Sequence, residues 1–518
     1  MSDPLFLTRE RVEELCTRVD RSSLAEGDRV VIKACLRHCF ALGQAYTEKT
    51  YTVHKLLKMI FGAKTEKAET VLPNLPKKPQ SDKPPPRGHG RNGAASYTGG
   101  KRVTVSHDAL KSGDGCPRCQ TGKLYPSAPG VTVRITGNAP LTATSFECEK
   151  LRCNCCGEVF TAKLPDTVGP EKYDATSGAM IALLKYGTGV PFNRLETLQD
   201  ALGVPLPAST QWDIVEKHAD RAHPAYKELI RQAAQGEIIH LDDTTMKILL
   251  AINEHEGRSG TFTTGMLSIT DERKIALFFT GHKHAGENLA DLLAKRHTDL
   301  PPPIQMSDAL SRNAPKELAT ILANCLTHGR RNFVDVAMSF PEECRQVIEL
   351  LAKVYHNDAH TKEEKMSRPE RLVYHQTHSG PVMKELHVWM TAQFDQKKVE
   401  PNSGLGKAFT YMLKHWEPLT LFLRVSGAPL DNNIVEQALK MAIRNRKNSL
   451  FYRTLHGAYI GDLFMSLIHT CRLSKVNPLQ YLVVLQHYSH EVFKNPSAWL
   501  PWNYEAAVAA ASQPHPPP

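Results

Sequence analysis

The sequence predicts a multidomain α/β protein whose largest part is a mixed sheet. Ile238–Thr245 is apolar and then acidic, and Thr261–Ile269 and Lys274–Thr280 follow it as two further runs with strand character. His284–Arg296 then has helical spacing, and Pro303–Asp308 and Ala323–His328 each have the pattern of a short strand. Three strands, a helix and further strands in this order indicate a mixed α/β sheet.

Composition limits the class of protein. The 518 residues suffice for two to four domains, and 41% hydrophobic with 23% charged residues is typical of a soluble globular chain. Lys and Arg number 64 against 54 Asp and Glu, a net charge of +10 that hints at a polyanionic partner. The sequence has no apolar run of transmembrane length and no signal peptide at Met1. We therefore expect no membrane contact, a cytoplasmic, nucleoid-associated location and reduced cysteines.

The first hundred residues divide into a helical segment and a linker. Residues 1–72 are expected to be helical, with apolar residues at helical spacing between Arg29 and Phe61. This segment either packs within the monomer or pairs with a second copy. Residues 73–105 are basic and rich in Pro and Gly, a composition that builds no core. Arg87 and Arg91 could lie in a DNA minor groove, and the alternative is a plain solvated linker.

Residues 106–165 have the cysteine spacing of a zinc ribbon. Two Cys-x-x-Cys pairs flank a stretch with expected strands at Val131–Ile135 and Ser145–Leu151. Four thiolates around one zinc ion would supply the folding free energy of a module with few large apolar residues. The expected zinc ligands are Cys116, Cys119, Cys153 and Cys156.

Residues 170–232 predict a helical, helix-turn-helix-like DNA-binding domain. Ala175–Lys185 and Phe192–Leu202 have helical spacing, and Ser209 is expected to cap a third helix through Val215. The same pattern also fits a small helical domain without DNA contact.

Two strand-end acids suggest a metal site. Asp242 closes the first predicted strand and Asp308 closes the fourth, so the two carboxylates could meet at one edge of the sheet. Such carboxylates can share two divalent cations that activate a water or a DNA 3′-hydroxyl. A lone acid at a strand end is more often a turn former.

A third acid lies on a basic helix. Asn432 or Asn433 can cap a helix that begins near Ile434. The spacing of four, four and three residues places one acid and three bases on one face, as a metal-bound carboxylate beside a phosphate backbone requires. The alternative is a solvated, salt-bridged surface helix. The four residues are Glu436, Lys440, Arg444 and Lys447.

Several motifs follow one another along the chain. They are His240-x-Asp242-Asp243-Thr244, Gln305-Met306-Ser307-Asp308-Ala309, Cys325-x-x-His328-x-Arg330-Arg331-x-Phe333, Asp431-Asn432-Asn433-x-x-Glu436 and Arg446-Lys447-Asn448-x-x-Phe451. In this order they resemble the transposases of the sixty-six group of bacterial insertion sequences. Phe61–Lys67 resembles the N-terminal signature of that family, the cysteine pairs its zinc-binding segment, and Ser466–Cys471 its C-terminal segment.

The resemblance implies an RNase H-like catalytic core with an Asp-Asp-Glu triad. By motif, the triad is Asp242, Asp308 and Glu436, and it would hold two Mg²⁺ or Mn²⁺ ions. Asp243 would point to the opposite side of its strand. Because 128 residues separate the second and third acids, a helical insertion is expected at 341–425. It would divide the core into segments 236–340 and 426–490, and a tail would follow at 491–518.

The implied activity is metal-dependent cleavage and strand transfer at inverted-repeat DNA ends. Arg330 and Arg331, with the three bases of the Glu436 helix, are the expected phosphate contacts. Cys325 and His328 are too few for a metal site and are assigned to structure or to holding transposon ends. A homodimer or higher oligomer is expected in the synaptic complex, and accessory proteins of the same element are further candidate partners. The alternatives are a catalytically silent or repurposed DNA-binding protein and a nuclease without strand transfer.

Overall fold

The computed structural model describes residues 9–38, 40, 94–96, 101–128, 131–135, 137–152, 154, 156, 158–165, 168–250, 260–270, 273–313 and 319–512. The chain divides into two compact units, one of residues 1–75 and 141–518 and one of residues 76–140. Among the described residues, no helix is long and apolar enough to cross a membrane.

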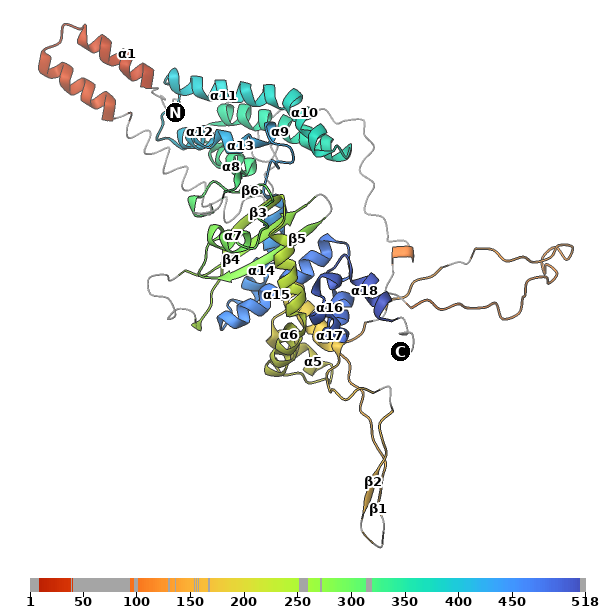
Figure 1. Cartoon of the computed structure of the whole chain (residues 1–518). Coiled ribbons are helices and arrows are strands. Elements are labelled where there is room, and N and C mark those ends of the chain that lie inside the picture. Colours follow the sequence, from red (N-terminus) through yellow and green to blue (C-terminus); the bar gives the residue numbers. More distant parts are fainter. Residues whose placement is uncertain are drawn as a thin grey trace. The chain divides into compact units, whose positions relative to one another are not determined.

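A five-stranded mixed sheet forms the centre of the first unit (Figure 1). Its strands are β3 (Ile238–Thr245), β4 (Phe262–Ile269), β5 (Lys274–Gly281), β6 (Ile304–Ser307) and β7 (Ile321–Asn324). The strand order is β5-β4-β3-β6-β7; β4 is antiparallel to both of its neighbours, whereas β3, β6 and β7 run parallel. The mixed α/β sheet expected from the sequence is therefore present.

Helix α15 (Leu455–Leu473) closes the open edge of β5 with polar side chains. Thr470, Ser466 and Asp462 lie on successive turns, and they accept hydrogen bonds from the backbone N–H groups of residues 276, 278 and 280 at 3.1, 3.0 and 2.6 Å. A four-residue helical step and a two-residue strand step both advance about 6 Å, so the two rows stay in register. The outward-facing backbone N–H groups of the edge strand β5 are thus hydrogen-bonded without a sixth strand.

One hydrophobic core joins β3, β4 and β5 to helices from both sides of the insertion. It includes the fully buried Tyr186, Tyr226, Phe278 and Phe464. The N-terminal helices are α4 (Ala175–Ala182), the π-helix η2 (Leu183–Gly187), α5 (Phe192–Ala201), α6 (Ala208–Ala233) and α7 (Ala285–Leu293). The C-terminal helices are α14 (Asn433–Ser449), α15, α16 (Pro478–His487), α17 (Ser489–Lys494), η6 (Pro496–Trp499) and α18 (Tyr504–Ala511).

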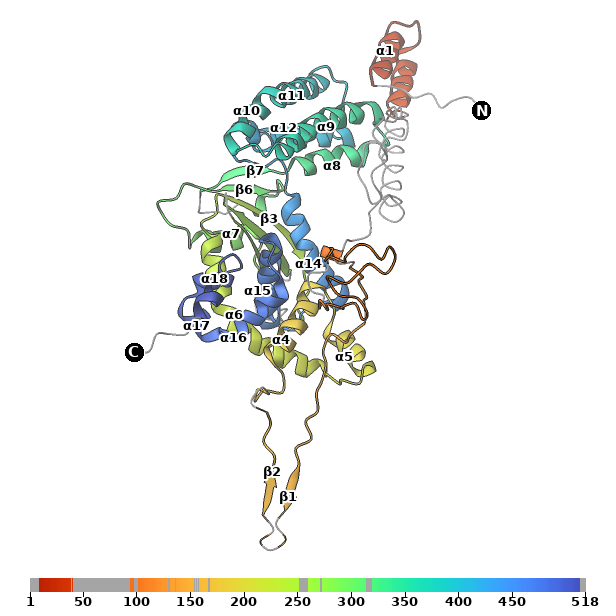
Figure 2. The ribbon, with the colours of Figure 1, turned by 90° about the vertical axis from the view of Figure 1, so that its right-hand side faces the viewer.

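A second hydrophobic core holds the helices between β7 and α14. It buries Phe333, Leu351 and Phe409 together with Met306 of β6 and Ala323 of β7. Figures 1 and 2 show these helices grouped beyond β6 and β7, away from α15. They are α8 (Leu326–Val336), α9 (Pro341–Glu363), α10 (Arg368–His378), α11 (Gly380–Asp395), α12 (Gly404–Lys414), α13 (Trp416–Leu419) and η5 (Leu421–Leu423).

The N-terminal third is described only in part. Helix α1 (Arg9–Asp20) is followed by helical residues 26–38, and the expected signature Phe61–Lys67 lies outside the described residues. So do Arg87 and Arg91 of the basic linker, of which a short 3₁₀ turn η1 (Ala94–Ser96) and residues 101–105 are described. Strands β1 (Lys150–Arg152) and β2 (Val159–Thr161) form an antiparallel pair.

Four local predictions from the sequence are wrong in whole or in part. Val131–Ile135 is not a strand, and the strand expected from Ser145 begins only at Lys150. Ser209 does not cap α6, which already begins at Ala208 after Pro207. Ala323–His328 is half strand and half helix, because α8 begins at Leu326 with Cys325 as its N-cap. A short apolar run fits either structure, and tertiary packing decides between them.

Candidate active site

Asp242 lies within β3, and Asp308 directly follows the neighbouring parallel strand β6. β3 pairs with β6 so that His240 is opposite Met306. Continuing this register by two residues places Asp308, which directly follows β6, beside Asp242. The loop after β6 restrains the side chain of Asp308, because the backbone N–H of Leu310 donates to its Oδ1 at 3.3 Å.

A glycine on β4 lets α14 approach the sheet beside Asp242. Gly265 is directly opposite Asp242 in the antiparallel β3–β4 pair, so both positions face the same side. A Cβ at position 265 would lie 2.8 Å from Leu439 Cγ and 3.5 Å from Val435 Cγ2. The helix can rest on this face because residue 265 has no side chain. Glu436 lies on the turn of α14 that makes this contact.

Negative charges converge on Asp242. Its pKa is raised to about 7, first by burial and then by the charges of Asp308, Glu436 and Asp243. The backbone N–H of Asp243, which donates to Asp242 Oδ1 at 2.8 Å, opposes this rise. Carboxylates gathered in this way repel one another unless a cation lies between them. Oxygen donors of this kind suit Mg²⁺ or Mn²⁺.

Asn432 ties together the three elements that carry the site. Its side-chain amide donates to the carbonyl of Leu241 on β3 at 2.9 Å, and its carbonyl accepts from His240 Nδ1 at 3.1 Å. Its backbone N–H donates to Cys325 Sγ, between β7 and α8, at 3.2 Å. Burial lowers the pKa of His240 to about 4, so the ring is neutral at pH 7 and Nδ1 carries the donated proton.

The role of this asparagine differs from the predicted one. Asn432 is the N-cap residue of α14, but its side chain bonds to β3 and makes no capping hydrogen bond. Asp431 instead accepts from the Asn433 N–H at 3.1 Å. The sequence pattern placed the helix start correctly within a residue and missed the contact that positions the helix against the sheet.

Asp243 serves the opposite face of β3, as strand alternation predicts. Its side chain is only 2% exposed. It accepts hydrogen bonds from Thr264 Oγ1 at 2.6 Å and from the Ala285 N–H at 3.0 Å, and His284 Nδ1 lies 3.3 Å away. Asp243 therefore anchors the N-terminus of α7 on the face away from Asp242.

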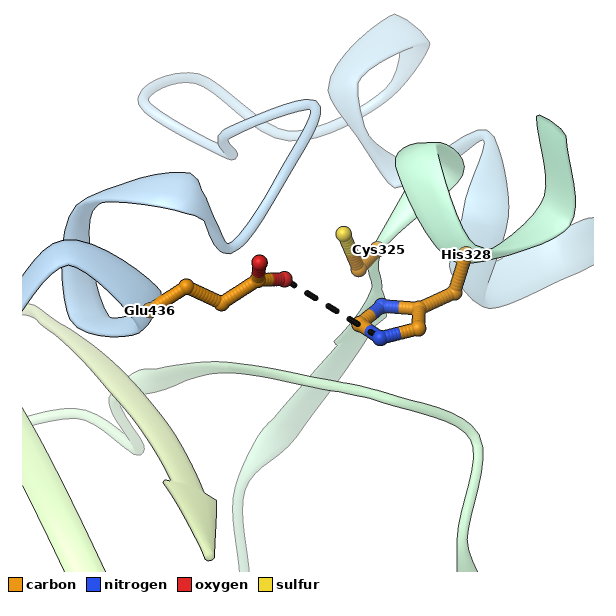
Figure 3. Close-up of side chains that lie close together, drawn as sticks. All are labelled: Cys325, His328 and Glu436. Carbon is orange, nitrogen blue, oxygen red and sulfur yellow. Dashed lines mark ion pairs between the residues drawn. The ribbon is translucent and has the colours of Figure 1, made fainter. Parts of the chain in front are cut away.

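Cys325 and His328 lie beside Glu436, so a third ligand-type residue joins the two found in the sequence (Figure 3). His328 Nε2 lies 3.9 Å from Glu436 Oε1, and the ligand atoms of all three residues are within 4.8 Å of one another. In the part of the chain that the structure describes, Asp242, Asp308 and Glu436 do not form so tight a group.

The predicted phosphate contacts lie on two helices. Lys440, Arg444 and Lys447 are exposed on α14. Arg330 and Arg331 are half-buried on α8, within the first two turns after Cys325. The two helices that carry these bases also carry Glu436 and His328, so positive side chains flank the acidic site on both.

Two residues near the site make contacts that the sequence did not predict. Arg446 Nη1 donates to Thr244 Oγ1 at 3.0 Å and to Thr245 Oγ1 at 2.7 Å, which fixes the far end of α14 to β3. Tyr411 comes from α12 of the insertion, where burial and then the charge of Asp308 raise its pKa to about 12. Its separation from Asp308 along the chain hides this contact from any local pattern.

The first cysteine pair has the local geometry of a metal-binding knuckle. In the 76–140 unit, the backbone N–H of Cys116 donates to the carbonyl of Gly122 at 2.7 Å and closes a tight turn. The pKa of the Cys119 thiol is lowered to about 6, chiefly by the backbone N–H of Gly122 and by Thr121. Hydrogen bonds that favour a thiolate are what a zinc ligand requires.

The second cysteine pair follows β1 in the other unit. Cys156 is exposed in the turn between β1 and β2. Cys153 lies outside the described residues, as does the neighbouring Cys155. Zinc binding by the two pairs together stays a prediction from the sequence.

Comparison with known proteins matches this arrangement to one family. Residues 172–460, more than half of the chain, match the family described as Transposase IS66 family. In Sinorhizobium fredii, the protein named "Uncharacterized protein y4hP" is 26% identical over 388 residues, which cover 70% of this chain and 68% of the relative. A second protein from that organism, "Uncharacterized protein y4jD", is 33% identical over 190 residues, 36% of each chain. The family match includes β3, β6, α8 and α14, and the chain belongs to the IS66 family of transposases.

Proposed function

We propose that this transposase cuts the inverted-repeat ends of an insertion sequence and joins them to target DNA with Asp242, Asp308 and Glu436. The observation that carries the proposal is the convergence of these carboxylates, since the charges of Asp308 and Glu436 both raise the pKa of Asp242. The order β5-β4-β3-β6-β7, antiparallel and then parallel, supports an RNase H-like core. Membership of a transposase family makes DNA the partner.

The donor set fits two hard divalent cations. All three side chains offer oxygen atoms, and the charges of Asp308 and Glu436 both act on Asp242. Asp242, Asp308 and Glu436 would together hold the two Mg²⁺ or Mn²⁺ ions. Bound there, the ions would lower the pKa of a water and offset the charge that develops on the leaving oxygen.

The proposed reaction is two phosphoryl transfers at one site. In cleavage, a water oxygen bonds to the phosphorus at the element's end, the bond to the 3′-oxygen breaks, and the element keeps a free 3′-hydroxyl. In joining, that hydroxyl bonds to a target phosphorus, the target 3′-oxygen leaves, and the hydroxyl proton passes to solvent. Such chemistry depends mainly on positioning and charge neutralisation, which the Asn432 contacts and the bases of α14 serve.

Other parts of the chain would hold the DNA. Lys440, Arg444 and Lys447, with Arg330 and Arg331, would contact phosphates without reading bases. The α4–α6 helices, the basic linker and a zinc-bound ribbon would recognise the inverted repeats. Two ends must be held together for joining, so the active form would be at least a dimer, with accessory proteins as further partners.

The rival function is DNA binding without catalysis. A catalytically silent or repurposed transposase would keep the basic surfaces that bind DNA, but it would not require the three acids for catalysis. All three acids are present and gathered at one edge of the sheet, which supports catalysis. A nuclease without strand transfer would use the same site, and the reaction products distinguish it.

The test is strand transfer of a labelled inverted-repeat end with Mg²⁺, comparing wild type with Glu436→Gln. The substitution keeps the shape of the side chain and removes its charge. We expect wild type to cut and join DNA and the variant to bind the end without reacting. Wild type that binds the end and never reacts, even with accessory proteins of the element, would favour the binding function. A variant as active as wild type would remove Glu436 from the site.

A further inference from the structure

Three side chains from separate elements meet beside the acidic site with a mixed sulfur, nitrogen and oxygen donor set. Cys325 is the residue between β7 and α8, His328 lies in the first turn of α8, and Glu436 lies in the first turn of α14. Figure 3 shows the thiol, the imidazole and the carboxylate directed toward one space. Glu436 Oε1 and His328 Nδ1 are buried atoms without a hydrogen-bond partner among the described residues.

The spacing suits one tetrahedral ion. Ligand atoms around zinc lie about 3.3–3.8 Å apart when each is about 2.0–2.3 Å from the metal. The three ligand atoms here are within 4.8 Å of one another, and His328 Nε2 and Glu436 Oε1 are 3.9 Å apart. Small side-chain movements of about 1 Å would therefore close the site. His328 and Glu436 are 26% and 27% exposed, which leaves a path from solvent.

The backbone around Cys325 favours a metal-bound thiolate. Cys325 is the N-cap of α8, so its sulfur lies at the positive end of a helix. The Asn432 N–H donates to Sγ at 3.2 Å. Burial raises the pKa of the free thiol to about 11, while the backbone N–H groups of His328, Asn432 and Thr327 act in the opposite direction. The metal-free thiol is therefore protonated, and an incoming ion must displace that proton.

We propose that Cys325, His328 and Glu436 bind one zinc ion, with its fourth position open to water or a phosphate oxygen. Thiolate and imidazole ligands select zinc over Mg²⁺, which prefers oxygen donors and octahedral geometry. The site differs from the cysteine ribbon in residues and in donor set.

Zinc at this site takes Glu436 from the carboxylate group. Glu436 cannot serve a tetrahedral zinc ion and a Mg²⁺ ion beside Asp242 in the same position. Zinc therefore acts as a competitive inhibitor of the Mg²⁺-dependent reaction. This inhibition rests on the proposed function, whereas zinc binding itself does not. Zinc bound to Glu436 would inhibit the Mg²⁺-dependent reaction without binding Asp308.

The binding test counts zinc per full-length chain after dialysis against zinc, with ribbon sites filled. We compare wild type with Cys325→Ser and His328→Gln, and use Cys344→Ser as the matched control. Cys344 is also fully buried in the second core, so it measures the cost of a buried hydroxyl alone. We expect both site variants to bind one zinc fewer than wild type and the control to bind as many. Equal zinc counts in wild type and His328→Gln, a substitution of a side chain that is 26% exposed, would overturn the proposal.

A second arm separates this site from the proposed function. Zinc is titrated into the Mg²⁺-dependent cleavage assay, and each variant is compared with its own rate in Mg²⁺ alone. We expect Cys325→Ser to need at least about tenfold more zinc for half-inhibition than wild type or Cys344→Ser. Cleavage by wild type with unchanged zinc counts in the site variants refutes the zinc site alone. Reduced counts in a chain that never cleaves refute the proposed function alone.

Discussion

Asp242 and Asp462 are two carboxylates of the same unit whose pKa values are both raised to about 7. Asp462 is raised by burial alone, while the N–H and hydroxyl of Thr280 both donate to it at 2.6 Å and oppose the rise. Asp242 is raised by burial and then by Asp308 and Glu436. One carboxylate is isolated and fully hydrogen-bonded, and the other faces like charges.

The difference distinguishes a structural acid from the one that we propose to be catalytic. A raised pKa reports burial in both cases and does not by itself mark a site. Acids from different elements that converge repel one another, and a bound proton or a cation offsets that repulsion. Asp462 completes the edge of a sheet, whereas Asp242 faces the charges of Asp308 and Glu436.

The largest effect is expected on catalysis. Asp242→Asn removes a metal-binding charge at the centre of the site, so strand transfer should fall by about a thousandfold or more. Asp462→Asn should retain most of the activity, since an amide can accept from the Thr280 N–H and donate to its hydroxyl. Single-turnover cleavage in Mg²⁺ measures both. Similar losses in the two variants would erase the distinction between the acids.

The next effect is on the pH dependence of stability. The folded-state pKa of Asp462 lies above its ordinary value, so protonated Asp462 contributes stability at low pH that is lost as the pH rises from about 4 through about 7. Above pH 7 the penalty is on the order of 4 kcal/mol. Denaturant midpoints of wild type should therefore fall between pH 5 and 8 relative to those of Asp462→Asn. Parallel curves for the two proteins would contradict the raised pKa.

A smaller effect is expected from the glycine that admits α14. Gly265→Ala places a Cβ 2.8 Å from Leu439 Cγ, so the helix or the side chain must shift, at a cost of about 1–3 kcal/mol. A displaced Glu436 should lower cleavage by about ten- to a hundredfold. Gly281→Ala on β5 is the control, because no atom lies within 4 Å of its added Cβ. Equal cleavage rates would show that α14 does not depend on this contact.

The smallest effect is a stabilisation by Mg²⁺. A cation at ten times its dissociation constant adds about 1.4 kcal/mol to the free energy of unfolding, or a rise of a few degrees in Tm. Wild type and Asp462→Asn should both show this rise, and Asp242→Asn should not. Thermal melts with and without Mg²⁺ make the comparison, and a rise in Asp242→Asn would place the ion elsewhere.

Much of the sheet could be predicted because its signals are local. The run Ile238–Thr245, with its apolar start and acidic end, matches β3 residue for residue, and Lys274–Thr280 differs from β5 by one residue. Ala323–His328 could not be resolved, because only the fold shows that Leu326 already belongs to a helix. The helices of the insertion followed from the length of the gap before Glu436.

The candidate site was predictable only where chemistry coincides with a motif. Asp242 and Asp308 are marked by their strand ends, and Glu436 by the family resemblance. Gly265 and Tyr411 carry no such mark, because each matters through a contact with a distant part of the chain. Sequence reasoning also judged Cys325 and His328 too few for a metal, since their third partner lies more than a hundred residues away.

The hydrogen bonds by which α15 covers the edge of β5 affect how the chain folds during its synthesis. Asp462 follows Thr280 by 182 residues, so a growing chain makes the β3–β5 hairpins long before the helix that covers their edge. At about 5–20 residues per second, that delay is roughly 10–40 s. During synthesis the strand edge is open to other nascent chains from the same messenger. Each new molecule must pass through this interval before α15 protects its strand edge.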